Sequence, residues 1–112
     1  MATSKKIRFS VWGPSARKFN LSNAAARLPL DGYTTRSQAV AHSIERRTGL
    51  EVINMRQDSQ EQRADGAILS TTYEITLGRT LYRRGLGGRR YSDGCSVEGS
   101  LWVSIPTAAS EE

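Results

Sequence analysis

The pattern that most restricts how this chain can fold is a strict alternation of side chains over residues 68–77. One set of alternate positions is apolar or bulky: Leu69, Thr71, Tyr73, Ile75 and Leu77. The other set carries hydroxyl groups or charge: Ser70, Thr72, Glu74 and Thr76. A period of two predicts a β-strand with one face in the core and the other in water. The same alternation predicts strands over residues 5–12, ended by Gly13-Pro14, and over residues 97–105, ended by Pro106.

One long helix is predicted over residues 36–48. Thr35 is followed three residues later by Gln38, which is the spacing of a capping box, and Gly49 stands where a helix commonly ends. The apolar stripe at helical spacing is narrow: Val40, Ala41, Ile44 and Thr48. A narrow stripe is typical of a helix that lies on one sheet.

The stretch between the first strand and this helix, residues 13–33, shows no clear period. Within it, residues 22–28 predict a short helical turn, with Ser22 as its N-cap and Pro29 at its end. We expect the rest of this stretch to be irregular.

The chain after the helix also divides into regular and irregular parts. Residues 50–56 predict a further strand, whereas residues 58–66 are polar and hold a turn signal at their end. Gly78 predicts a bulge or bend in the strand that begins at residue 68, and residues 80–84 are expected to continue that strand.

These elements follow the order β-α-β-β-β and place the chain in the α+β class. Short links between the last strands predict a single antiparallel sheet of about four strands, with the main helix packed on one face. Residues 85–94 would then form the tip of a protruding basic hairpin loop. At 112 residues the chain fits a single domain, expected over residues 1–106, with a frayed tail over residues 107–112.

Composition predicts an intracellular protein. Cys95 is the single cysteine, so an internal disulfide is excluded. No apolar run approaches the roughly 18 residues of a membrane span, and the first nine residues lack the apolar core of a secretory signal. A reducing, cytoplasmic location is therefore expected.

The strongest functional signal is a basic segment over residues 79–91. It holds five arginines and no acidic residue, and so carries a charge equal to the formal net charge of +5: Arg79, Arg83, Arg84, Arg89 and Arg90. Tyr82 and Tyr91 flank the inner arginines, and Gly85, Gly87 and Gly88 loosen the backbone between them. Guanidinium groups beside aromatic rings suit a polyanion, and nucleic acid is the first candidate. We expect the arginines to follow the phosphate backbone of DNA or RNA, the tyrosines to stack, and Arg17 and Lys18 to extend the surface.

Other interpretations of the same segment remain open. It could dock to an acidic protein surface, or be a solvated loop that keeps the protein soluble. The first of these fits a second class of protein, a small inhibitor or adaptor that binds a larger protein or nucleoprotein machine. Small, motif-free chains with the arginine, alanine and glycine usage of a GC-rich genome are common among bacteriophage accessory proteins, including inhibitors of host polymerase or of CRISPR complexes. A homodimer formed through an edge strand or through the outward face of the sheet is also open.

Trp12 and Trp102 fall on the outward positions of their strands, beside Lys6 and Arg8. They could form a stacking platform for bases on an open sheet face. Because large aromatic side chains are mostly buried, the favoured expectation is instead that residues 13–33 cover both tryptophans in a second small core.

Catalysis is not expected. His42 and Cys95 are each the only residue of their type, too few for a closed zinc site without carboxylates at unusual spacing. The glycine-rich run at residues 85–88 lacks the lysine, hydroxyl and helix of a phosphate-binding loop. The sequence therefore predicts a binding protein with no cofactor and no metal.

Overall fold

The computed structural model describes residues 4–21, 24–29, 33–88 and 90–107; for residues 4, 83, 86 and 90–93 it describes the backbone alone. Five strands form one antiparallel sheet in the order β2-β1-β5-β4-β3. The elements, in chain order, are β1 (Ser4–Trp12), α1 (Pro14–Lys18), β2 (Ala24–Pro29), α2 (Arg36–Thr48), β3 (Glu51–Gln62), β4 (Ile68–Arg84), the 3-10 turn η1 (Leu86–Gly88) and β5 (Arg90–Pro106). The α+β class and the single antiparallel sheet are as predicted, with five strands in place of about four.

The additional strand corrects the prediction of a helical turn over residues 22–28. β2 pairs with β1 along its whole length, and Ala24 and Ala26 are buried opposite Phe9 and Ile7. Alanine is the strongest helix former, so local propensity favoured a turn of helix. Burial of alternate alanines against a neighbouring strand overrides that propensity, and Pro29 is tolerated because β2 lies at the edge of the sheet.

The stretch expected to be irregular after β1 also contains the short helix α1. Pro14 occupies its first turn, where a missing amide donor costs nothing, and Gly13 precedes it with a φ of 114°. Ala16 and Leu21 join the main core of the protein.

α2 has the predicted bounds and caps. The Thr35 hydroxyl accepts a hydrogen bond from the Gln38 amide at 3.3 Å, and the Gln38 side chain accepts one from the Thr35 amide at 3.0 Å. Gly49 closes the helix in the left-handed conformation, with a φ of 72°. The side chains that α2 contributes to the core cluster are Ala39, Val40 and Ile44.

The last three strands are longer than predicted. β3 continues to Gln62, through residues that were expected to be irregular because they are all polar. Most of these side chains are exposed, so there is no buried face to impose an alternation, and pairing with β4 alone holds this end of the strand. β4 runs without interruption through Gly78, where the predicted bulge is confirmed as a shift in register against β5. A Cβ atom at Gly78 would lie 2.0 Å from the Ser96 carbonyl oxygen, so this close approach requires glycine.

The sheet has one buried face and one open face. The strand side chains in the core are Ile7, Phe9, Val11, Ala24, Ala26, Ile75, Leu77, Leu101, Val103 and Ile105. The alternate side chains, none of which is buried, form what we call the open face: Lys6, Arg8, Ser10, Trp12, Ala25, Arg27, Ser70, Thr72, Glu74, Thr76, Ser100, Trp102 and Ser104. The expected second core over the tryptophans is wrong: Trp12 is 44% exposed, and Trp102 is half-buried. The reason is that α1 and Leu21 pack into the main core instead of crossing the outer face.

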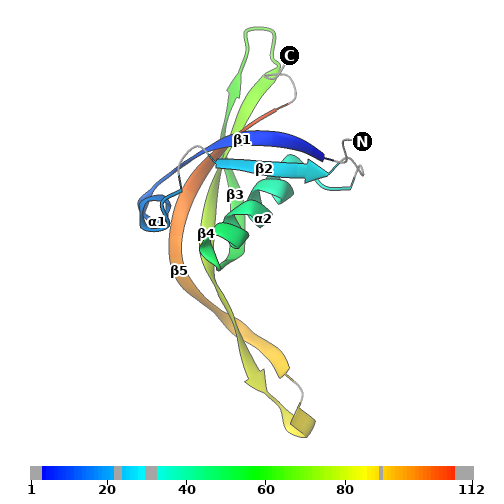
Figure 1. The fold of residues 1–112 in the computed structure, drawn as a ribbon, viewed down its shortest axis with the longest axis vertical. Helices are drawn as coiled ribbons and strands as arrows, with labels where there is room; N and C mark the ends of the chain where they lie inside the picture. The colour runs from blue at the N-terminus through cyan, green and yellow to red at the C-terminus, as the bar shows by residue number, and fades with distance from the viewer. Residues whose placement is uncertain (1–3, 22–23, 30–32, 89, 108–112) are drawn as a thin grey trace.

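The molecule is elongated, as Figure 1 shows, with β4 and β5 running along its length. Its extents are 57 × 36 × 26 Å and its radius of gyration is 16.3 Å. A compact domain of this length would have a radius of gyration of about 13 Å. At the other end of β5, Thr107 donates a backbone hydrogen bond to Leu69 at 2.9 Å, while the rest of the expected tail, residues 108–112, lies outside the described residues.

Candidate nucleic-acid interface

The predicted basic hairpin is the far end of the two longest strands. Beyond Gly78, β4 and β5 continue as a two-stranded ribbon that ends with Arg84 opposite Arg90. The turn Leu86–Gly88 joins the two strands. We call residues 79–96 the β-arm. In Figure 1 the β-arm extends away from both helices and from the remaining strands of the sheet.

Described side chains of the β-arm are open to solvent on both of its faces. Tyr82 is 55% exposed, and Arg79 and Arg84 are also exposed. Leu81, which points to the face opposite Tyr82, is 47% exposed. No residue of the β-arm belongs to the described core, so its ladder of hydrogen bonds is what maintains its shape.

The other predicted residues of the arm are described in part. For Arg83, Arg90 and Tyr91 the structure gives the backbone, which places Arg83 opposite Tyr91 and Arg84 opposite Arg90. Arg89 lies outside the described residues. The last two rungs of the ladder therefore bring together Arg83, Arg84, Arg90 and Tyr91 near the tip, whereas Arg79 lies at the base.

Glu51 fixes the base of the β-arm. Its Oε2 atom accepts a hydrogen bond from the Thr80 amide at 2.7 Å and a second one from the Thr80 hydroxyl. These two bonds lower the pKa of Glu51 below its ordinary value of 4.5, and the positive charge of Arg79 adds to the effect. An ionised Glu51 thus joins β3 to β4 at the rung where the arm leaves the body.

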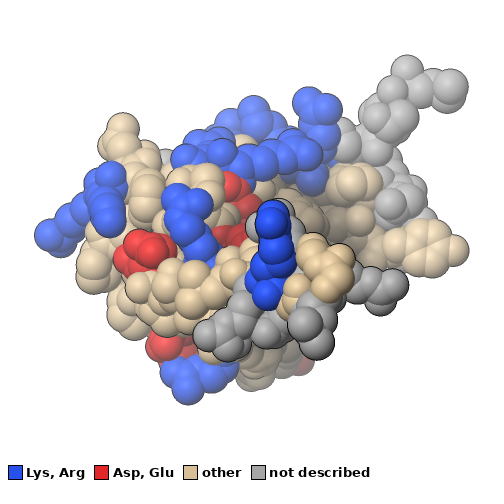
Figure 2. All heavy atoms as spheres, turned by 90° about the horizontal axis from the view of Figure 1, so that it is seen from below, with Lys and Arg blue, Asp and Glu red and all other residues tan. Residues whose placement is uncertain are grey.

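Arg17 and Lys18 lie beside the base of the arm and not at its tip. Both are exposed on α1, and the Lys18 amino group sits 5.6 Å from the centre of the Phe19 ring. α1 packs against β5 close to the base of the arm. A Cβ atom at Gly99 would lie 2.0 Å from the Ser15 hydroxyl oxygen, so this close contact requires glycine. Seen from below, with the arm toward the viewer, Lys and Arg side chains are spread over the visible surface, with acidic side chains between some of them (Figure 2).

Three basic residues outside the arm gather in a way that the sequence did not reveal. Arg27 of β2 and Arg46 and Arg47 of α2 line a hollow of ≈ 580 Å³ between these two elements. The position of Arg27 beside α2 was missed because residues 22–28 were predicted to form a helical turn and not a strand. Glu45, which precedes Arg46 along the chain, accepts a hydrogen bond from the Val52 amide at 2.9 Å.

The two single-copy residues do not form a catalytic pair among the described residues. His42 lies on α2 with its Nδ1 atom 3.4 Å from Glu45, and Cys95 is exposed on the β-arm opposite Thr80. Within the described ranges, no group of three or more His, Cys, Asp or Glu residues is arranged to hold a metal ion. No helix in the described part of the chain is long and apolar enough to cross a membrane. No family model, curated protein or solved structure matches the chain at a significant level.

Proposed function

We propose that this protein is a non-catalytic, cytoplasmic nucleic-acid-binding protein that grips the phosphate backbone with its β-arm. One observation carries the proposal: the segment that holds the clustered arginines is a two-stranded ribbon extending clear of the core, with its described side chains in water. Such a ribbon contributes little apolar burial to its own fold. We attribute the length of the β-arm to contact with a partner.

The dimensions of the β-arm suit duplex DNA. From Arg79 to Arg84 the strand covers about 17–20 Å, at about 3.3 Å per residue. The major groove is about 12 Å wide and admits a two-stranded β-ribbon. A ribbon lying in the groove would direct arginine side chains toward the phosphates on either side, while Tyr82 offers a ring and a hydroxyl to the groove. Contacts of this kind give affinity without demanding a sequence.

Salt dependence tests this proposal directly. Five arginines at phosphates predict that log K falls with log salt at a slope of about −4.5 on duplex, at about −0.9 per contact. The variant Arg83→Ala/Arg84→Ala/Arg89→Ala/Arg90→Ala removes four of these contacts, so its slope should flatten to about −1. Fluorescence anisotropy of a labelled duplex of about 30 base pairs over a salt series measures both slopes.

A matched control separates the arm from general charge. The variant Arg46→Ala/Arg47→Ala/Arg56→Ala/Arg63→Ala also removes four arginines and lowers the net charge equally, but none of them lies on the β-arm. Its slope should stay near that of the wild type. Equal flattening in the two variants would show that net charge, and not the arm, drives binding.

A second function is favoured by exposed apolar side chains on the same ribbon. Leu81 is 47% exposed and Val97, next to the base of the arm, is 67% exposed. These side chains gain nothing from phosphates, but they would be buried against a protein. We keep as the alternative an inhibitor or adaptor that inserts the β-arm into a larger protein or nucleoprotein machine. In that case Leu81→Ser/Val97→Ser would abolish retention of a partner of fixed stoichiometry and leave duplex affinity unchanged.

A further inference from the structure

The open face of the sheet is a second candidate surface, distinct from the β-arm. Neither α1 nor α2 covers it, since the buried side chains of both helices join the core on the other face. Its side chains are mostly hydroxyl-bearing, basic or aromatic, and include no Val, Leu or Ile. A polar sheet face that neither helix covers and that carries aromatic rings is the type of surface on which single-stranded nucleic acids stack their bases.

The aromatic end of this face consists of Trp12 and Trp102. They stand directly opposite each other in the β1–β5 ladder. The backbone at Gly13 packs closely against the indole of Trp102 and holds it in place. A Cβ atom at Gly13 would lie 3.0 Å from Cε3 of this ring. Trp12 keeps 44% of its surface in water. The indole of Trp102 is thus held by the backbone, and that of Trp12 is accessible to a base. This arrangement suits a stacking platform.

The basic end of the face consists of Lys6, Arg8 and Arg27. Lys6 and Arg27 are directly opposite each other in the β1–β2 ladder, and Arg8 follows Lys6 on the same face. Like charges directly opposite each other destabilise a sheet. In the described part of the chain none of the three forms an ion pair. Their repulsion is therefore left without a countercharge from the described residues.

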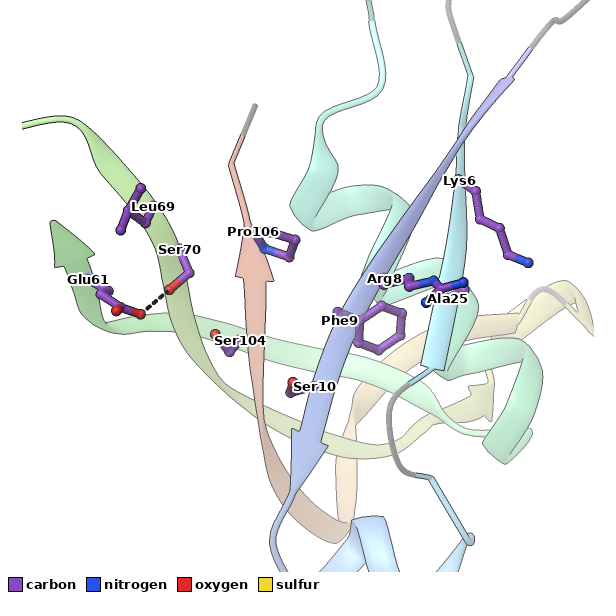
Figure 3. Close-up of a pocket in the computed structure, with 10 residues that line it drawn as sticks. All are labelled: Lys6, Arg8, Phe9, Ser10, Ala25, Glu61, Leu69, Ser70, Ser104 and Pro106. Carbon is purple, nitrogen blue, oxygen red and sulfur yellow. Dashed lines mark hydrogen bonds between the residues drawn. The ribbon is translucent and has the colours of Figure 1, made fainter. Parts of the chain in front are cut away.

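A cleft lies beside Lys6 and Arg8 at the basic end. β1 and β5 pair only over residues 10–12 and 102–104 and then diverge, which opens a cleft of ≈ 810 Å³. Ser10 and Ser104 stand opposite each other in the ladder at the closed end of the cleft, and in Figure 3 Arg8 and Lys6 lie on its β1 side. Both hydroxyls are hydrogen-bonding groups for sugar and phosphate oxygens.

The acidic residues beside this face lie on β3 and β4. Glu61 is on β3, where its Oε2 atom accepts a hydrogen bond from the Ser70 hydroxyl at 3.4 Å. Glu74 stands opposite Trp102 in the β4–β5 ladder, where its carboxylate is paired with Arg56 at 3.1 Å. The unpaired positive charge of the described part of the face is concentrated on β1 and β2, which favours a polyanion along β1.

We propose that the open face binds single-stranded DNA or RNA along β1, with bases on Trp12 and Trp102 and phosphates on Arg8, Lys6 and Arg27. The path from Lys6 to Trp12 is about 20 Å long, at about 3.3 Å per residue, and accommodates about six nucleotides at the spacing of a stacked strand. A duplex is excluded because its bases are stacked on one another and cannot lie on the indoles. The site does not rest on the function proposed for the β-arm.

Intrinsic fluorescence reports on this face alone, because Trp12 and Trp102 are the only tryptophans of the chain. Titration of the full chain with oligothymidylate or oligouridylate of about 15 nucleotides should quench the fluorescence in a saturable way. A duplex of the same length should leave it nearly unchanged, even where it binds elsewhere. Trp12→Leu should weaken binding of the single strand by about 5-fold to 100-fold, and Trp12→Phe by less, because a smaller ring still stacks.

The basic end is tested by the salt slope for the single strand. Lys6→Ser/Arg27→Ser should make the slope shallower by about 1.4, at about 0.7 per phosphate contact on single strands. Arg8→Ser should make the slope shallower by about 0.7, whereas its matched control Arg63→Ser, which removes the same charge from the turn between β3 and β4, should leave the slope unchanged. Far-UV circular dichroism and the thermal midpoint of each variant establish that it is folded.

Three results would overturn the proposal. The first is the absence of quenching with either single strand at low salt. The second is an equal change of the salt slope in Arg8→Ser and in its control Arg63→Ser, which would show that the net charge of the protein, and not this face, drives binding. The third is equal quenching by polyglutamate of similar length, which would assign the face to an acidic polypeptide. None of these results bears on duplex binding by the β-arm, so failure here and failure of the arm are distinguishable.

Discussion

Glu51 shows how a single side chain can control the β-arm. Its carboxylate accepts two hydrogen bonds from Thr80, and both exist only when β3 and β4 are paired. They favour the ionised form, so the pKa of Glu51 in the folded protein lies below its ordinary value of 4.5. Its contribution to stability is therefore complete above pH 4.5 and is lost as the pH falls below that value, through the lowered pKa.

We expect the amide proton of Thr80 to titrate with an apparent pKa below 4.5. Two-dimensional NMR over a pH series measures this shift. The Thr80 resonance in Glu51→Gln should not titrate, because the glutamine side chain cannot ionise. Retention of the arm pairing at neutral pH in Glu51→Gln is expected, since the amide oxygen still accepts a hydrogen bond. An apparent pKa at or above 4.5 would show that the two bonds do not form in solution.

Among the elements, α2 is the one whose ends are most firmly set by local sequence. The reciprocal bonds between Thr35 and Gln38 satisfy donors that the first turn leaves unpaired. Thr35→Ala should lower the free energy of unfolding by about 1 kcal/mol, measured by chemical denaturation. Thr35→Ser keeps the hydroxyl and should stay within about 0.5 kcal/mol of the wild type. Equal losses in both variants would point to packing of the threonine methyl group and not to the cap.

The elements also show which parts of the fold were predictable from the sequence. α2 and the strand residues flanking the core have strong periodic signals, and Gly78 marked a register shift that β4 and β5 do contain. β2 was not predictable, because an alanine run favours helix until a neighbouring strand buries alternate residues. The far half of β3 was not predictable either. Both of its faces are exposed, so its sequence need not alternate between apolar and polar residues.

The candidate sites differ in the same way. The arginine cluster was visible in the sequence because its members are close along the chain, and hairpin pairing keeps Arg83, Arg84 and Arg90 close in space. The open face combines residues from β1, β2 and β5. Arg27 lies on it because it belongs to β2, the strand that the sequence did not predict. Trp12 and Trp102 were placed on the outward side correctly, but whether that side is covered depends on where α1 packs, which no local pattern specifies.

The whole molecule consists of a body that holds the core and an arm that holds none of it. The two parts should therefore be separable. Thr80 and Cys95 face each other in the ladder, so an Asn-Gly turn can replace residues 81–94 and close a short hairpin at that rung. The bonds from Glu51 to Thr80 remain available in this variant, and every described core residue is kept.

We expect the shortened protein to fold with nearly the same thermal midpoint, because no side chain of the described core is lost. Small-angle scattering should give a radius of gyration that falls toward the roughly 13 Å of a compact domain of this length. Duplex affinity should fall to a background level with a shallow salt slope, whereas quenching of tryptophan fluorescence by single strands should persist. Loss of both activities in a folded protein would mean that arm and face form one continuous site, and retention of duplex binding would place that activity on the basic residues of the body.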